Sequence, residues 1–325
     1  MLLPVLAILL GLALLVWSSD RFVDGASGIA RSLGLSPLII GITIVGLGTS
    51  APEMLVAAIA SFQGNASLGV GNAIGSNIAN IALILGVTAL VAPVVISSGL
   101  IRLELPILLA GMVFGLLLIL DNYLSLADGL LLLLALGVVM GILLYDAIHV
   151  KPSDVLVEEL ADEVNLEMPL RTAIFWFSVG LIVLLISARM LVWGAVDVAQ
   201  AFGISDLVIG LTIVAIGTSL PELAASIASA RKGESDIAVG NVIGSNLFNL
   251  FGVMSLPGII APSALPAEVL QRDYPLMLAL TVALFFMAFK FRPSSRNRRI
   301  HAVEGLALLA VFIGYQTWLF MGSQA

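Results

Sequence analysis

Two glutamates far apart in the chain stand in matching surroundings. Glu53 ends a Gly-Thr-Ser-Ala-Pro-Glu segment that begins at Gly48, and Glu222 ends a Gly-Thr-Ser-Leu-Pro-Glu segment that begins at Gly217. Both segments lie inside long apolar runs, where a carboxylate is costly and usually marks an ion or proton path. Two carboxylates balance the charge of a divalent cation, and hard cations prefer oxygen ligands. The pair therefore predicts a divalent-cation site.

Each of these segments should also break its helix. Proline removes a backbone donor and clashes with the carbonyl four residues back, and glycine weakens the helix nearby. Carbonyls freed in this way must face protein or a wet cavity when the helix lies in lipid. Hydroxyl oxygens at the same level come from Thr49, Ser50, Thr218 and Ser219. We expect the backbone and these side chains to offer oxygen ligands together.

A stripe of polar residues follows each break. Asn72, Ser76 and Asn80 are four residues apart, so they share one face of a helix. The second stripe has the same spacing and consists of Asn241, Ser245 and Asn249. A single stripe of this kind is best explained by interhelical packing and hydrogen bonding. Two stripes, each at the same distance from a helix-breaking glutamate, favour ion coordination.

The composition requires that these residues be positioned by membrane helices. Of 325 residues, 60% are hydrophobic and 11% are charged, against about 25% charged in soluble domains. The mean hydropathy is +1.14. The chain has no cysteine and two histidines, which excludes thiolate zinc sites and leaves no material for haem. The net charge of -7 argues against nucleic acid as a partner.

Ten apolar runs are long enough to cross a hydrocarbon core of about 30 Å. Of the 14 Lys and Arg residues, 12 fall in the loops of one side and only Arg189 and Arg272 fall on the other. The positive-inside rule then places both termini outside and the loop after the fifth span in the cytoplasm. The predicted spans are Leu2–Trp17, Pro37–Phe62, Leu68–Ile96, Leu103–Leu120, Leu126–Tyr145, Leu170–Val192, Leu207–Ala230, Ile237–Ala261, Tyr274–Phe289 and Val303–Met321.

The sequence nearly repeats at an offset of 169 residues. The repeat covers the glutamate segments, the polar stripes and isolated positions such as Pro93 with Pro262. Five is an odd number of spans, so the second copy enters the membrane upside down, as in many secondary transporters. We predict an all-α membrane protein with ten transmembrane helices in two inverted five-helix repeats. Residues 1–148 and 169–325 form the repeats, joined by a short acidic cytoplasmic loop at 149–168.

At these motifs the sequence resembles the calcium/cation antiporter superfamily, which includes the sodium/calcium exchanger family. The two signatures of that superfamily stand here at Gly48–Glu53 with Gly75–Asn80, and at Gly217–Glu222 with Gly244–Asn249. Length, the short central loop and motif wording are most similar to the bacterial inner-membrane YrbG-type branch. The resemblance implies a multi-pass protein of a bacterial inner membrane that exchanges Ca²⁺ for Na⁺.

The resemblance also implies roles for individual residues. Glu53 and Glu222 would share Ca²⁺ with the carbonyls of Thr49 and Thr218, while Asn80 and Asn249 line the middle of the site. Na⁺ would occupy that site and two flanking ones. One flanking site would use Thr49, Ser50, Ser76 and the carbonyl of Gly46. The other would use Thr218, Ser219, Ser245 and the carbonyl of Ala215. Asparagine at both middle positions weakens the case for potassium co-transport.

Several alternatives remain open at the level of the sequence. The same scaffold could exchange Ca²⁺ for protons, since two buried glutamates can carry protons. A cation channel or a membrane scaffold without transport would be different classes. An enzyme is the weakest interpretation, because no nucleophile–base pair, HExxH motif or phosphate loop is present. No cofactor is expected beyond the transported ions and the lipid bilayer. The sequence leaves the oligomeric state open, a monomer included.

Overall fold

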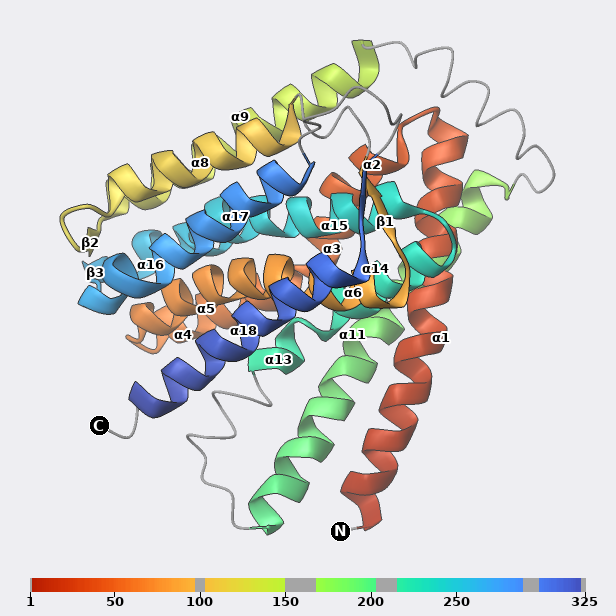
Figure 1. Ribbon diagram of the computed structural model, residues 1–325, viewed down its shortest axis with the longest axis horizontal. Coiled ribbons are helices and arrows are strands. Elements are labelled where there is room, and N and C mark those ends of the chain that lie inside the picture. Colours follow the sequence, from red (N-terminus) through yellow and green to blue (C-terminus); the bar gives the residue numbers. More distant parts are fainter. Residues whose placement is uncertain (1, 97–102, 150–167, 203–214, 289–297, 323–325) are drawn as a thin grey trace.

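The computed structural model describes residues 2–96, 103–149, 168–202, 215–288 and 298–322, and nearly all of them are helical (Figure 1). The elements of the first half are α1 (Leu2–Leu33), α2 (Pro37–Ile40), η1 (Gly41–Val45), α3 (Gly46–Thr49), α4 (Ala51–Phe62), α5 (Ala66–Ala79), η2 (Asn80–Leu85), α6 (Gly86–Val91), β1 (Val94–Ile96), α8 (Glu104–Leu118), β2 (Tyr123–Leu124) and α9 (Leu126–His149). Those of the second half are α11 (Leu170–Ala201), α13 (Ala215–Thr218), α14 (Leu220–Arg231), α15 (Ser235–Leu247), η4 (Phe248–Val253), α16 (Ser255–Ile260), β3 (Ser263–Ala264), η5 (Val269–Asp273), α17 (Tyr274–Ala288), β4 (Arg298–Ile300) and α18 (Ala302–Gly322).

Seven of the described helices are long and apolar enough to cross a membrane. A bent pair, Pro37–Thr49 and Ala51–Phe62, meets at 41° and raises the number to eight, and Glu104–Leu118 is a shorter apolar helix. Large apolar side chains face outward, as in α1, where Leu2 is 75% exposed. Such a surface is stable in lipid and not in water. The chain is therefore a multi-pass helical membrane protein, as predicted.

The helical class holds with one addition, and parts of the predicted elements lie outside the described residues. Short antiparallel strands pair β1 with β4 and β2 with β3, and the sequence analysis did not predict them. The start of the predicted seventh span, at Leu207, lies outside the described residues. The predicted acidic loop at 149–168 lies almost entirely outside them as well.

The first and sixth predicted spans are longer than expected. The predicted spans end at Trp17 and Val192, but α1 and α11 each contain 32 residues. At 1.5 Å per residue each is about 48 Å long, well beyond a hydrocarbon core of about 30 Å. Polar residues after Trp17 end the apolar run without ending the helix. The helix stops only before Gly34, whose φ of +65° favours glycine.

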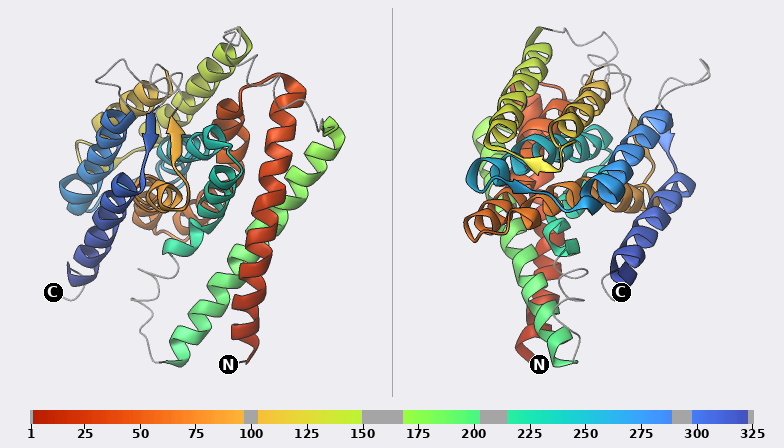
Figure 2. Two further views of the ribbon diagram at one scale, coloured as in Figure 1. Left: turned by 45° about the vertical axis from the view of Figure 1, so that its right-hand side comes forward. Right: turned by 90° about the vertical axis from the view of Figure 1, so that its left-hand side faces the viewer.

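Helices α1 and α11 lie side by side, and the C-terminal part of α1 also packs on α14 and α2 (Figures 1 and 2). Early residues of one meet late residues of the other, so the two helices are antiparallel. Glycines permit this approach, since a Cβ on Gly11 would meet the backbone of Leu191, and a Cβ on Gly180 would meet that of Phe22. Gly11 and Gly180 are 169 residues apart, and so are Phe22 and Leu191. Each contact thus has a repeat-related counterpart in which the two helices exchange roles.

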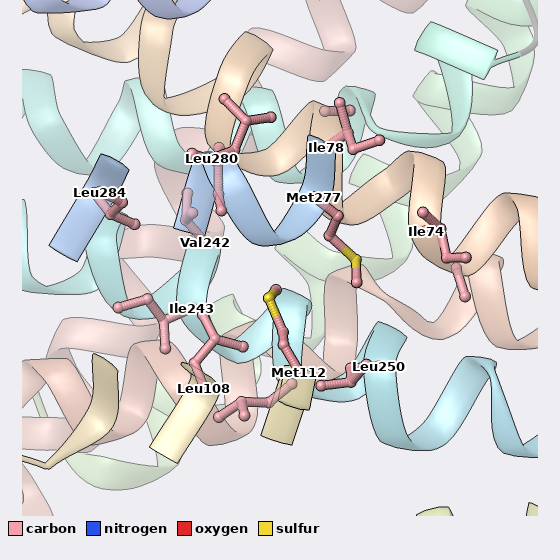
Figure 3. Close-up of a cluster of buried hydrophobic side chains, with 14 of the residues drawn as sticks. Ile74, Ile78, Leu108, Met112, Val242, Ile243, Leu250, Met277, Leu280 and Leu284 are labelled. Carbon is pink, nitrogen blue, oxygen red and sulfur yellow. The ribbon is translucent and has the colours of Figure 1, made fainter. Parts of the chain in front are cut away.

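The largest buried cluster lies between the polar stripe helices and their neighbours. Figure 3 shows Ile74 and Ile78 of α5 facing Met277 of α17, with Met112 of α8 and Ile243 of α15 completing the cluster. This packing fixes α5 and α15 relative to each other. Each stripe helix continues into a π-helical turn, η2 or η4, at repeat-related positions. Such turns often occur at functional sites.

Candidate functional site

Both predicted helix breaks are present. Ser50 interrupts the helix between α3 and α4 with φ -82° and ψ 0°, and Ser219 does so between α13 and α14 with φ -91° and ψ 5°. Pro52 and Pro221 are the second residues of the new helices. Proline is tolerated in a first helical turn, because its missing N–H would have no partner there. The same motif therefore ends one helix and starts another in both halves.

The two glutamates follow these breaks and are almost completely buried. Glu53 and Glu222 are each 1% exposed. Among the described residues, Oε2 of Glu53 and both carboxyl oxygens of Glu222 have no hydrogen-bond partner. The carboxyl of Glu222 lies close enough to interact electrostatically with that of Glu53. Buried oxygens without partners are costly, and a cation would satisfy them.

The hydroxyl groups of the first break are buried as well. Thr49 and Ser50 are each 0% exposed. Oγ of Ser50 has no hydrogen-bond partner among the described residues. Thr49 Oγ1 lies 3.4 Å from Oγ of Ser245 on α15. The structure thus brings together groups from the two halves of the chain.

At the second break, Ser219 is 2% exposed, while Thr218 is only partly buried. The two residues whose carbonyls were implicated, Gly46 and Ala215, begin α3 and α13 at repeat-related positions. The Gly46 carbonyl accepts the backbone N–H of Ser50 at 3.0 Å. The same carbonyl also accepts a longer hydrogen bond from Oγ1 of Thr49 at 3.4 Å.

Most members of the two stripes are buried next to the breaks. Ser76 is 6%, Asn80 1%, Ser245 0% and Asn249 1% exposed. Asn80 Nδ2 donates to Oδ1 of Asn246 at 3.0 Å, which joins the two stripe helices directly. Oδ1 of Asn249 has no described partner. Asn80 and Asn249 therefore differ in their contacts, although they are equivalent in the repeat.

The first asparagine of each stripe has a different environment. Asn72 donates to the backbone carbonyl of Glu53, and Asn241 to that of Glu222. Sequence reasoning grouped these two residues with the rest of the stripe and missed this contact. The available signal was that each asparagine recurs at one fixed distance from its glutamate.

A third buried carboxylate was also missed. Glu104, in the first turn of α8, is 4% exposed, and its Oε2 has no hydrogen-bond partner among the described residues. The sequence analysis assigned no role to Glu104, which stands near the edge of an apolar run. Packing of α8 against α15 buries it.

The oxygen atoms gathered at the site suit a hard cation, and only two of the groups that supply them are carboxylates. No group of three or more His, Cys, Asp or Glu side chains gathers within the described part of the chain. The site instead combines two carboxylates with hydroxyl, amide and carbonyl oxygens. Such all-oxygen sets match Ca²⁺, which takes six to eight oxygen ligands.

Comparisons with known proteins identify the family. The sequence matches the family model of the sodium/calcium exchanger protein over residues 3–145 and 172–321. The chain belongs to the sodium/calcium exchanger family. It is 48% identical to CaxA of Alkalimonas amylolytica over 98% of this chain and 99% of that protein. It is 42% identical to the inner membrane protein YrbG of Escherichia coli (strain K12) over 90% of this chain and 91% of that protein.

A solved structure of the sodium-calcium exchanger NCX_Mj, soaked with 2.5 mM Na⁺ and 0.1 mM Ca²⁺, is similar over almost the whole chain. It has a TM-score of 0.82 and 31% identity, and the match covers 96% of this chain and 97% of that one. The family match and the identity to YrbG confirm the predicted superfamily and branch. Membership places this protein among membrane transporters that exchange cations, rather than among enzymes.

Proposed function

We propose that this protein is a secondary-active antiporter that exchanges Ca²⁺ for Na⁺ across a bacterial-type inner membrane. The observation that carries the proposal is the pair of buried carboxyl groups, Glu53 and Glu222, at two matching helix breaks. Three of their four oxygens have no hydrogen-bond partner among the described residues. The relatives support the choice of ions, since NCX_Mj is a sodium-calcium exchanger.

In this proposal the two glutamates share Ca²⁺ with the carbonyls of Thr49 and Thr218. Na⁺ takes the same place and two flanking sites. One flanking site uses Thr49, Ser50, Ser76 and the Gly46 carbonyl. The other uses Thr218, Ser219, Ser245 and the Ala215 carbonyl. Asn80 and Asn249 line the middle. The contacts of Thr49 with groups of the second half support a site shared by both halves.

The proposal includes ten spans in two inverted repeats, residues 1–148 and 169–325, with both termini outside. Inversion is supported by the antiparallel α1–α11 contacts, in which each close approach has a counterpart with the helices exchanged. The distribution of 12 basic residues on one side against two on the other supports the orientation. The ions then pass through a site between two halves that face opposite sides of the membrane.

Alternating access follows from this arrangement. Helices α1 and α11 pack mainly on each other, and α1 also packs on α14, the helix that carries Glu222 (Figure 2). We propose that this pair moves across the site as a unit and opens it to one side at a time. Na⁺ moving down its gradient would then drive Ca²⁺ the other way.

Calcium uptake into proteoliposomes preloaded with Na⁺ tests the proposal. The parent should accumulate Ca²⁺ only when Na⁺ is inside, and Glu53→Gln and Glu222→Gln should each reduce this uptake to background. Glu104→Gln is the matched control, because it neutralises a buried carboxyl outside the proposed site. It should retain uptake.

The same vesicles distinguish the alternatives. Uptake driven only by an imposed proton gradient, without Na⁺, would make the protein a Ca²⁺/H⁺ antiporter. Flux that neither saturates nor needs an ion on the opposite side would indicate a channel. No Ca²⁺ movement under either gradient would contradict calcium exchange altogether.

A further inference from the structure

Asn72 and Asn241 make the same contact in the two copies of the repeat. Nδ2 of Asn72 lies 3.2 Å from the carbonyl oxygen of Glu53, and Nδ2 of Asn241 lies 3.2 Å from that of Glu222. In both cases donor and acceptor are 19 residues apart. Each bond ties a stripe helix to the first turn of the helix that carries the glutamate.

We infer that Asn72 and Asn241 are positioning residues for the two carboxylates, an inference that rests on the exchange function proposed above. Each glutamate is the third residue after its helix break, so the helix on its N-terminal side gives its backbone little support. A side-chain amide bound to the glutamate carbonyl fixes the backbone from which the carboxylate extends. Ion sites depend on such support, since small displacements of a ligand weaken coordination.

Asn241, the repeat equivalent of Asn72, makes further hydrogen bonds. It is 0% exposed, and its Nδ2 also donates to Oγ of Ser226 at 2.9 Å. Its Oδ1 accepts the hydroxyl of Thr49 at 3.0 Å, from the other copy of the repeat. One side chain therefore connects the backbone at Glu222 with the hydroxyl next to Glu53.

The contact with Thr49 competes with a local one. Oγ1 of Thr49 also lies 3.1 Å from the carbonyl of Val45, one turn earlier in its own helix. A hydroxyl has a single proton, so it donates to Asn241 or to Val45 but not fully to both. The link between the two copies can therefore form and break without leaving the Thr49 hydroxyl unpaired. Through Asn241, the conformation at the break that carries Glu222 therefore affects the break that carries Glu53.

The test compares Asn72→Leu and Asn241→Leu with the parent in the proteoliposome assay. Leucine has the same number and branching of side-chain heavy atoms as asparagine, although its methyl groups are larger, and it removes the amide. A polar contact between membrane helices contributes about 0.6 to 2 kcal/mol, which corresponds to about threefold to thirtyfold in an equilibrium constant. We expect the Ca²⁺ concentration for half-maximal exchange to rise within that range, and more for Asn241→Leu than for Asn72→Leu. The folded fraction, measured by size-exclusion chromatography, should stay that of the parent.

Two controls separate positioning from general packing. Ser226→Ala removes one partner of Asn241 but keeps the bond to Glu222, and the equivalent residue of the first copy is Ala57. Asn65→Asp changes an exposed asparagine that caps α5. Both should keep the parent's half-maximal concentration. If Asn241→Leu does not fold, Asn72→Leu, at a partly buried position, tests the inference by itself.

A double-mutant cycle tests the link between the copies. Thr49→Val combined with Asn241→Leu should change the half-maximal Ca²⁺ concentration by less than the product of the two single effects. The reason is that both substitutions remove the same Thr49–Asn241 hydrogen bond. Thr49→Val with Asn72→Leu should give the full product. An unchanged half-maximal concentration in both leucine variants, with exchange intact in the parent, would overturn the inference. A parent without exchange would instead contradict the proposed function.

Discussion

The hairpins α4–α5 and α14–α15 have the same backbone but different chemistry at their turns. Each follows a break at serine with a helix of 12 residues, and each turn contains a glycine in the left-handed region, at φ +80° for Gly64 and +81° for Gly233. The residues flanking these glycines are Gln63 and Asn65 in the first copy and Lys232 and Glu234 in the second.

The charged turn is bound to α1. Nζ of Lys232 lies 2.6 Å from the Asp24 carboxylate, and Glu234 accepts hydrogen bonds from Ser27 at 2.9 Å and from Arg31 at 3.1 Å. The repeat equivalents of Asp24 and Arg31 on α11 are Trp193 and Gln200, and neither is charged. In Figures 1 and 2 the last turns of α11 lie away from the α4–α5 turn.

The backbone of the hairpin is therefore similar in the two copies of the repeat, whereas the side chains at the two turns differ in charge. By the proposed orientation, the charged turn lies on the cytoplasmic side, where α1 is docked. The uncharged turn lies on the opposite side. Under the proposed alternating access, the structure would correspond to a state in which α1 rests on the α14–α15 turn.

The largest expected effect comes from locking that contact. The chain has no cysteine, so Ser27→Cys with Glu234→Cys introduces a single pair of cysteines. They stand where Oγ of Ser27 donates to Oε1 of Glu234 at 2.9 Å. Oxidation should abolish Ca²⁺ exchange, because α1 can no longer move, and a reductant should restore it.

The repeat-related pair, Val196→Cys with Asn65→Cys, is the control for this locking experiment. It should cross-link only under ion conditions that favour the opposite state. Full exchange by the oxidised Ser27–Glu234 pair would show that α1 does not move away from this turn during transport.

A second effect concerns the glycines of the stripe helices. A Cβ at Gly244 of α15 would overlap the backbone of Ile42, whereas its equivalent Gly75 has no described atom within 4 Å of such a Cβ. Gly244→Ala should cost about 1 to 3 kcal/mol through overpacking and lower the Tm. Gly75→Ala should not.

Alanine at Gly137, an exposed position of α9, controls for the helix propensity of alanine itself. Its Tm should equal or slightly exceed that of the parent. An equally large Tm loss for Gly75→Ala would mean that the two stripe helices are packed alike.

The turn glycines should behave identically in the two copies. Neither Gly64 nor Gly233 has a described atom within 4 Å of an added Cβ, so only the positive φ opposes a side chain. Gly64→Ala and Gly233→Ala should each cost about 1 kcal/mol, seen as matching decreases in Tm. Unequal decreases would show that the backbones of the two turns are not equivalent.

The smallest effect is expected when the charged turn is given the residues of the uncharged one. Lys232→Gln with Glu234→Asn keeps Gly233 but removes ion pairs that contribute about 0.2 to 1 kcal/mol each. For the two pairs together this is about 0.4 to 2 kcal/mol, so amide hydrogen exchange of the α14–α15 turn should accelerate about twofold to thirtyfold.

The uncharged α4–α5 turn serves as the internal reference, and its hydrogen exchange should not change. High salt should bring the parent close to the variant, because salt screens exposed charges. An α14–α15 turn that exchanges at the parent's rate in the variant would show that the ion pairs do not hold it on α1.

Local features were predicted well because they depend on few neighbours. Proline in the Gly-Thr-Ser-x-Pro-Glu segment cannot continue the helix that precedes it but can stand in the first turn of a new one, and the breaks at Ser50 and Ser219 follow from this. The end of α1 was wrong for an equally local reason. Hydropathy falls after Trp17 at a cluster of serines and charges, but helices end at backbone signals such as Gly34, not at changes of polarity.

The sequence by itself determined that two repeated helix breaks each place one glutamate within an apolar run, because proline, glycine and charge act locally. Only the tertiary structure decided which oxygens and amides meet. The hydroxyl of Thr49 reaches Asn241 across 192 residues of chain, and Glu104 is buried although it stands at the edge of its run. Such contacts depend on how helices pack against one another, and the spacing of residues along one helix carries no information about the face of another.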